Sequence, residues 1–259
     1  MTTIRGSAPA KINLTLHVTG QRADGYHLLD SLVAFAGVYD EITATTATDF
    51  HLKVSGPFAQ GVPTGESNLI MRAARMLQAK RGVTDGAHLT LEKNLPHAAG
   101  IGSGSSDAAI TLAVLAELWG VEPLAINAPE VLALGADVPV CMVAPSPVRM
   151  EGIGEILSPW SRLPDAAVVL VNPQVGVPTS AVFDGLASKR NPRMGTLPTG
   201  SDYQGFASWL AAQRNDLETP ARRVTPEIEA ALKALHRHPP VAPAARAPCG
   251  ARRWGRGVA

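Results

Sequence analysis

The sequence is poor in cysteine, with only Cys141 and Cys249 among its 259 residues. Two cysteines this far apart do not make a disulfide framework, and neither has the CxxC or Cys/His spacing of a structural metal site. The sequence also lacks a run of about 18 apolar residues, the length that spans a bilayer. Its first residues lack the apolar core of a signal peptide. We therefore expect a cytoplasmic protein without a membrane partner.

An excess of charge is missing as well. The chain has 23 Lys and Arg residues against 22 Asp and Glu residues, so its formal net charge is +1. No overall field then attracts nucleic acid or an anionic membrane, and an anionic ligand has to be held locally. The length is sufficient for one large domain or two smaller ones. We expect no nucleic-acid partner, and a monomer or homodimer.

Several familiar nucleotide and hydrolase motifs are absent. The chain contains no GxxxxGK[ST] P-loop, no GxGxxG with the acidic residue of a Rossmann unit and no HExxH. It has instead a glycine-rich stretch at residues 95–113, LPHAAGIGSGSSDAAITLA. Its glycine residues lie between an expected strand at 88–93 and an expected helix at 105–119, and its last residues belong to that helix.

The glycine-rich stretch is suited to binding phosphate. Glycine allows close approach of the backbone, and the N–H groups at a helix start carry a partial positive charge. A tight structural turn is the alternative. Ser105 and Ser106, at the expected helix start, could cap the helix, contact phosphate or help ligate Mg²⁺.

Two charged residues gain interest beside such a loop. Lys11 lies near the start of an alternating, half-buried strand at 7–18, and is either a solvated strand-end lysine or a cation for an anionic substrate. Asp137 lies between an expected helix or turn at 129–134 and an extended segment at 140–143. It is either a turn cap or a carboxylate that orients or deprotonates an acceptor hydroxyl. Loop, lysine, aspartate and Mg²⁺ would suffice for phosphoryl transfer.

An aromatic pair follows the Asp24-Gly25 turn. Tyr26 and His27 are either ordinary strand residues or a platform for a planar base. Elsewhere the patterns predict strands at 28–36 and 41–46, a helix at 68–80, a buried strand at 166–171, a helix capped by Thr179 or Ser180, and a helix at 226–235.

Five segments occur together in one order: PAKINL at 9–14, DGYH at 24–27, the glycine-rich stretch, GADVP at 135–139 and NDLE at 215–218. On these segments residues 7–235 resemble the GHMP kinase superfamily. The PAKINL and DGYH pair is typical of its members that phosphorylate a diphosphocytidyl methylerythritol. The resemblance implies a two-domain α/β (α+β) fold with the active site in the interdomain cleft. It places an N-terminal domain at 1–147 and an incomplete C-terminal domain at 148–235.

The resemblance also implies a role for each matched residue. Asp137 would be the base for the acceptor 2-hydroxyl, with Lys11 as its charged partner. Tyr26 would stack on the cytosine and His27 would hydrogen bond to it, while Asn13 would place the sugar-like end. Pro178 and Thr179 would lie near the cytidine pocket, and Ser105 and Ser106 are candidate magnesium ligands. The ATP loop would comprise Pro96, His97, Ala98, Ala99, Gly100, Ile101, Gly102, Ser103, Gly104, Ser105 and Ser106.

The implied activity is ATP-dependent phosphorylation of a diphosphocytidyl methylerythritol, in the non-mevalonate route to isoprenoid precursors. Another alcohol, such as homoserine or mevalonate, is disfavoured by the Tyr26 and His27 pair. Two loop residues, Ala98 and Ser103, stand where many relatives have glycine.

The end of the chain departs further from the superfamily. A further glycine-rich motif expected after residue 235 is absent, and residues 236–259 are rich in Pro, Arg and Ala without strand or helix periodicity. We expect an aberrant tail there, from a frameshift or truncation near His236. The alternative function is therefore a catalytically impaired nucleotide-binding relative.

Overall fold

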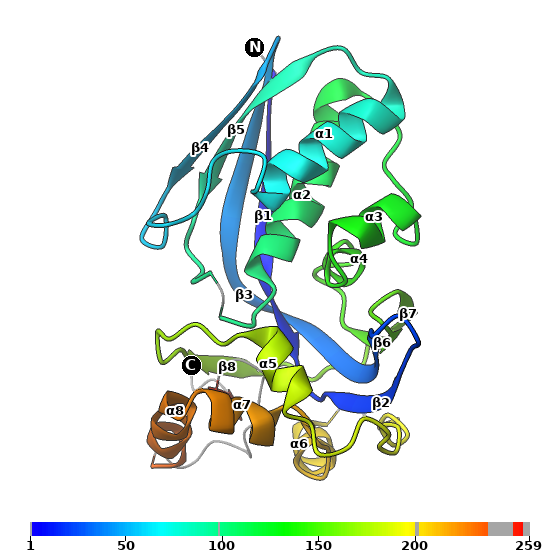
Figure 1. Ribbon diagram of the computed structural model, residues 1–259, viewed down its shortest axis with the longest axis vertical. Helices are drawn as coiled ribbons and strands as arrows, with labels where there is room; N and C mark the ends of the chain where they lie inside the picture. Colours follow the sequence, from blue (N-terminus) through cyan, green and yellow to red (C-terminus); the bar gives the residue numbers. More distant parts are fainter. Residues whose placement is uncertain (1, 98, 200–201, 238–250, 256–259) are drawn as a thin grey trace. The chain divides into compact units, whose positions relative to one another are not determined.

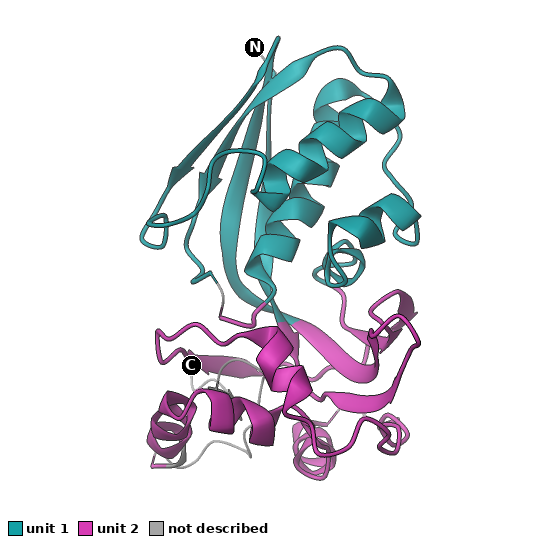
Figure 2. Ribbon diagram, viewed as in Figure 1, with its two compact units in different colours: residues 1–11, 35–97, 102–145 teal, residues 12–34, 98–101, 146–259 magenta. Residues whose placement is uncertain are grey.

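The computed structural model describes residues 2–97, 99–199, 202–237 and 251–255. The chain forms two compact units (Figure 2). Unit 1 comprises Met1–Lys11, Phe35–His97 and Gly102–Pro145, and unit 2 comprises Ile12–Ala34, Ala98–Ile101 and Ser146–Ala259. A change of unit falls at residues 145 and 146, close to the predicted domain boundary. Unit 2 also takes in residues 12–34, so the domain division at 147 and 148 stays a prediction.

Unit 1 is a sheet covered by helices. The sheet is built from β1 (Thr3–Asn13), the second half of β3 (His27–Ala47), β5 (Gly86–Glu92) and β4 (Phe50–Ser55). β3 pairs with β1 and runs antiparallel to β5, whereas β4 and β5 are parallel. The helices α1 (Leu69–Arg81) and α2 (Ser103–Trp119) lie along one face of this sheet (Figure 1). Two short helices, α3 (Pro129–Leu134) and α4 (Val138–Cys141), follow.

The predicted helices of unit 1 are confirmed, with small shifts at their ends. Asn68 caps α1, since its side chain accepts a hydrogen bond from the Ile70 N–H at 2.9 Å. Gly82 and Gly120 end α1 and α2 in the left-handed conformation, with φ of 64° and 63°. α2 begins at Ser103, two residues before the expected start.

The strand prediction at 7–18 is wrong in two respects. β1 ends at Asn13, and a separate strand β2 (His17–Gln21) follows. The polar residues of the alternation are not on a solvated face, because Asn13, Thr15 and His17 are all buried. Thr15 is accommodated by a hydrogen bond that its Oγ1 accepts from the Leu32 N–H at 2.9 Å.

The strands expected at 28–36 and 41–46 are one strand, β3, of 21 residues. Its first part pairs antiparallel with β6 (Val148–Gly152) in unit 2, from Leu29 opposite Gly152 to Val33 opposite Val148. Its last part pairs with β5 in unit 1, from Glu41 opposite Glu92 to Ala47 opposite Gly86. β2 also pairs with β3, and β6 pairs with β7 (Ile156–Pro159).

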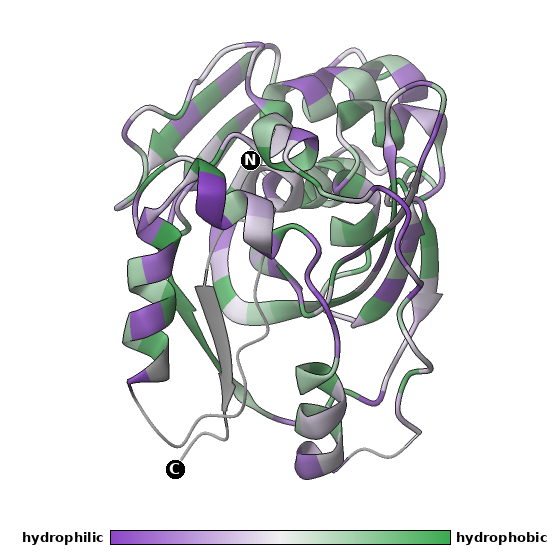
Figure 3. Ribbon diagram, turned by 60° about the horizontal axis from the view of Figure 1, so that its bottom comes forward, coloured by the Kyte–Doolittle hydropathy of each residue, from purple (hydrophilic) through white to green (hydrophobic). Residues whose placement is uncertain are grey.

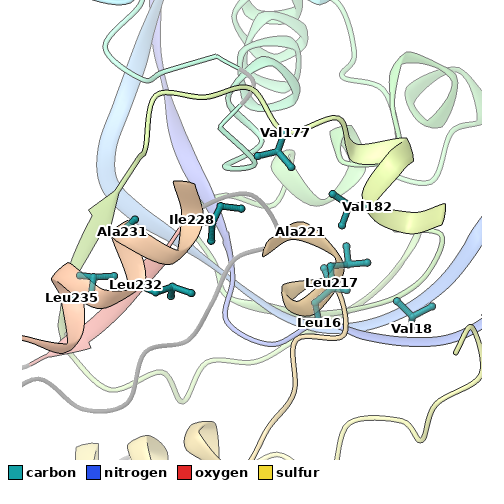
Figure 4. Close-up of a cluster of buried hydrophobic side chains, with 10 residues drawn as sticks. All are labelled: Leu16, Val18, Val177, Val182, Leu217, Ala221, Ile228, Ala231, Leu232 and Leu235. Atoms are coloured by element: carbon teal, nitrogen blue, oxygen red, sulfur yellow. The ribbon is translucent and has the colours of Figure 1, made fainter. Parts of the chain in front are cut away.

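Unit 2 also contains the helices α5 (Thr179–Asp184), α6 (Tyr203–Ala211), α7 (Glu218–Val224) and α8 (Glu227–His236). α8 carries both hydrophilic and hydrophobic residues (Figure 3). A hydrophobic cluster, called here the unit 2 cluster, joins residues of α5, α7 and α8 to the region around β2 (Figure 4). Its buried members are Leu16, Val18, Val177, Val182, Leu217, Ala221, Ile228, Ala231, Leu232 and Leu235.

The small sheet of unit 2 corrects two expectations. β8 (Ala167–Val171) was expected to be buried, but its residues are exposed or half-buried, and Val169 is 48% exposed. β9 (Ala251–Gly255) lies within residues 236–259, where no strand was expected, and pairs antiparallel with β8. A strand ladder is made by backbone groups, so it can form without an apolar alternation. Residues 238–250 and 256–259 of the expected tail lie outside the described residues.

No helix within the described ranges combines the length and the apolar character needed to cross a membrane.

Candidate active site

The glycine-rich loop, residues 96–106, connects β5 to α2 and continues into the first turn of that helix. Gly100 and Gly102 adopt φ of 66° and 63°, a left-handed conformation that favours glycine. Gly102 is the N-cap residue of α2 and offers no capping side chain. The first N–H groups of the helix are therefore without a side-chain cap, which suits an anion. Ala98 lies outside the described residues.

Lys11 and Asp137 form an ion pair, although they are 126 residues apart in the sequence. The Lys11 Nζ donates to Asp137 Oδ2 over 2.6 Å. The lysine side chain is only 5% exposed, whereas the aspartate side chain is 39% exposed. The ammonium is thus held inside unit 1 while the carboxylate remains accessible to solvent. Neither residue is an ordinary solvated end group.

The ion pair lies against the glycine-rich loop. A Cβ atom added at Gly102 would come within 3.1 Å of the Lys11 Cβ and Cε atoms. Any side chain at position 102 would therefore press on the lysine as well as strain the backbone. The glycine at this position allows loop and lysine to pack together.

The segment after Asp137 differs from the expected extended segment. Asp137 precedes the short helix α4, and Pro139 lies in the first turn of that helix. Proline is tolerated there because the first N–H groups of a helix have no intrahelical partner. Cys141, at the end of α4, is a free cysteine, and burial raises the pKa of its thiol, with Asp137 adding to the rise.

The two serines of the loop differ in their surroundings. Ser106 is fully buried in α2, and its Oγ has no hydrogen-bond partner among the described residues. Ser105 is half-buried, and its Oγ lies 4.0 Å from the position of a Cβ built on Gly135. No group of three or more His, Cys, Asp or Glu side chains suited to a metal ion occurs in the described part of the chain.

A second group of the expected site residues lies in unit 2. The rings of His27 and Phe183 are stacked, with centroids 4.6 Å apart and planes 20° from parallel. The Nε2 atom of His27 is buried without a hydrogen-bond partner in the described residues. Burial lowers the pKa of His27, and Lys189 lowers it further, so the ring is neutral at neutral pH.

The remaining expected substrate residues have contrasting environments. Tyr26, on the turn before His27, is 55% exposed. Asn13 is buried, and its Nδ2 donates to Ser31 Oγ over 2.9 Å. Pro178 is the N-cap residue of α5 and Thr179 begins that helix, so the expected capping role of Thr179 or Ser180 is wrong.

Phe183, which α5 brings onto the His27 ring, was not among the expected site residues. A single phenylalanine in a helix of six residues gives no pattern that would identify it. Asp40, Lys93 and Asp107 had no expected role either, although Lys93 and Asp107 flank the glycine-rich loop.

Comparison with known proteins gives one family and a consistent set of relatives. The GHMP kinases N terminal domain family matches residues 68–145, which include the glycine-rich loop and Asp137. The 4-diphosphocytidyl-2-C-methyl-D-erythritol kinase of Ruegeria pomeroyi is 52% identical over 233 residues, 90% of this chain and 81% of the relative. The protein of the same name from Dinoroseobacter shibae is 53% identical over 235 residues, 88% of this chain and 77% of the relative.

The structure has a similar counterpart among solved proteins. It matches a crystal structure of 4-(cytidine 5'-diphospho)-2C-methyl-D-erythritol kinase with a TM-score of 0.75 and 30% identity. The match covers 98% of this chain and 90% of that one.

Proposed function

Because this chain belongs to the 4-diphosphocytidyl-2-C-methyl-D-erythritol kinases of the GHMP kinase family, we propose that it phosphorylates the 2-hydroxyl of that alcohol with ATP. It is a kinase that transfers phosphate to an alcohol. The observation that carries the proposal is the Lys11–Asp137 ion pair, which packs on Gly102 of the glycine-rich loop.

Asp137 supplies the carboxylate of the reaction. Its side chain is 39% exposed, so one oxygen can reach an acceptor hydroxyl while Oδ2 accepts from Lys11. The carboxylate takes the hydroxyl proton as the hydroxyl oxygen bonds to the γ-phosphorus of ATP. The bond from that phosphorus to the bridging oxygen breaks, and ADP leaves. Lys11 holds the carboxylate in place and offsets the negative charge of the transferring group.

The glycine-rich loop holds the ATP phosphates. The uncapped N–H groups at the start of α2 bind the phosphate oxygens, and the left-handed Gly100 and Gly102 allow their close approach. The unpartnered Ser106 Oγ fits a magnesium ion, because Mg²⁺ prefers hard oxygen ligands and binds ATP phosphates with few protein groups. Ser105 and Ser106 would hold the ion, which would neutralise phosphate charge.

Residues of unit 2 recognise the cytosine. The neutral His27, fixed by the Phe183 ring, offers its free Nε2 to a hydrogen bond, and the exposed Tyr26 stacks on the base. Asn13 places the erythritol end, and Pro178 and Thr179 border the cytidine.

The proposal is tested by assaying Asp137→Asn with ATP, Mg²⁺ and 4-diphosphocytidyl-2-C-methyl-D-erythritol. Asparagine keeps the size of the side chain but cannot take the proton, so kcat is expected to fall by about 10²–10⁴-fold. The matched control is Asp85→Asn, which makes the same change at an exposed aspartate of unit 1 and should leave kcat unchanged.

Equal turnover by wild type and Asp137→Asn would remove Asp137 from the mechanism. Absence of turnover by the wild type would contradict the kinase proposal and favour the impaired relative. Turnover with homoserine or mevalonate in place of the cytidine substrate would overturn the substrate assignment.

A further inference from the structure

A buried cluster of three charged side chains lies beside the glycine-rich loop, and the proposed reaction does not use it. Asp40 belongs to β3, Lys93 directly follows β5, and Asp107 belongs to α2. The Lys93 Nζ lies 2.5 Å from Asp40 Oδ2 and 2.7 Å from Asp107 Oδ2. The side chains of Lys93, Asp40 and Asp107 are 2%, 0% and 5% exposed. Burying these charges is costly, so the cluster is a weak source of stability by itself.

The cluster also binds the backbone that leads into the loop. Asp40 Oδ1 accepts hydrogen bonds from the N–H groups of Asn94 and Leu95, over 2.6 and 2.7 Å. These two residues immediately precede the loop at residues 96–106, and Asp107 immediately follows it. Both ends of the loop are therefore bonded, through Asp40 and Lys93, to the same position of β3.

We propose that Asp40, Lys93 and Asp107 are positioning residues for ATP, which set the spacing between the two ends of the glycine-rich loop. The backbone N–H groups of a phosphate loop act only when they point at the phosphate together, so the loop ends have to be fixed. This inference rests on the proposed function for the identity of ATP. It does not depend on which alcohol accepts the phosphate.

The two aspartates of the cluster are not equivalent. The oxygens of Asp40 accept from three donors, the Lys93 Nζ and two backbone N–H groups. Asp107 accepts from Lys93 with Oδ2, while its Oδ1 has no partner among the described residues. Asp40 therefore connects Lys93 with the backbone at the start of the loop, whereas Asp107 acts chiefly as an acceptor for Lys93.

This difference gives the test. ATP affinity is measured by equilibrium dialysis, and KM is measured separately for ATP and for the alcohol, in Asp40→Asn, Asp107→Ala and Asp107→Asn. Asp40→Asn leaves one acceptor oxygen where Asp40 uses two, so either the Lys93 Nζ or the two backbone N–H groups lose their partner, and Asp107→Ala removes the α2 acceptor of the Lys93 Nζ. Each change breaks a connection at the ends of the loop, so ATP binding should weaken at least about tenfold, the scale of one lost buried partner. The KM for the alcohol should stay unchanged. Asp107→Asn keeps an oxygen that accepts from Lys93, and should bind ATP like the wild type.

A purely structural cluster gives a different result. If Asp40→Asn or Asp107→Ala lowers the melting temperature but binds ATP like the wild type, the proposal is overturned. If Asp40→Asn does not fold, the two Asp107 variants decide, and equal ATP affinity of both would overturn it. Wild-type protein that binds ATP without phosphorylating the alcohol would contradict the proposed function alone.

Discussion

The surroundings of Asp107 determine whether its carboxyl group is protonated. Asp40 and Asp107 both contact the Lys93 Nζ, and both are buried. Two carboxylates on one ammonium would leave a net negative charge in a buried site, which is unfavourable. A proton on Asp107, which accepts from fewer hydrogen-bond donors than Asp40, removes this excess negative charge.

We predict that this proton makes stability depend on pH. Burial raises the pKa of Asp107 from 3.8 to about 7 in the folded protein. Between these values the folded state keeps a proton that the unfolded state releases, so stability falls as pH rises, and the effect is complete above the folded pKa. Asp107→Asn removes this titration. The free energy of unfolding of Asp107→Asn should therefore rise relative to that of the wild type as the pH increases from 5 to 8. Urea denaturation measures both values. A difference that stays constant over this range would contradict the prediction.

At the scale of elements, local signals identified some boundaries and not others. The ends of α1 could be predicted because Asn68 and Gly82 carry their own capping chemistry. α4 was missed because Pro139 biases Val138 away from the helical region, yet a proline in the first turn costs nothing. β3 was divided in two because Gly37 and Asp40, residue types that are uncommon in strands, lie between its two apolar parts.

The cap of α1 gives a prediction at this scale. Asn68→Ala removes the acceptor of the Ile70 N–H, and should lower the free energy of unfolding by about 1 kcal/mol. Asn127→Ala, at an exposed asparagine before α3, should change it by less than about 0.5 kcal/mol. Urea denaturation of both variants measures the two effects, and equal values would show that the cap contributes nothing.

At the scale of the whole molecule, local patterns in the sequence could not reveal contacts between distant positions. Such patterns identified Lys11 and Asp137 only as separate candidates, and their pairing over 126 positions was expected from the family resemblance alone. The stacking of Phe183 on His27 and the pairing of β9 with β8 also join segments that are far apart in the sequence. Such contacts follow from the path of the chain, which local periodicity does not encode.

The unit 2 cluster gives a prediction for the molecule as a whole. Leu217 is 1% exposed and belongs to this cluster, so Leu217→Ala should lower the free energy of unfolding by about 2–5 kcal/mol. Val224→Ala, at a valine that is 38% exposed, is the control and should have a small effect. A loss of less than about 1 kcal/mol for Leu217→Ala would mean that the cluster does not stabilise the fold.

The continuous strand β3 limits how the length of this chain can vary. Its pairing with β6 covers Leu29 to Val33, and its pairing with β5 covers Glu41 to Ala47. Side chains of a strand alternate between faces, so one residue added or removed at positions 34–39 would reverse the faces of one pairing relative to the other. Asp40 and Lys93 continue the pairing with β5, so they would keep their register, and the change would fall on the pairing with β6. Insertions that the loops of the chain can absorb are therefore excluded from this segment, because the two pairings at its ends fix its residue count.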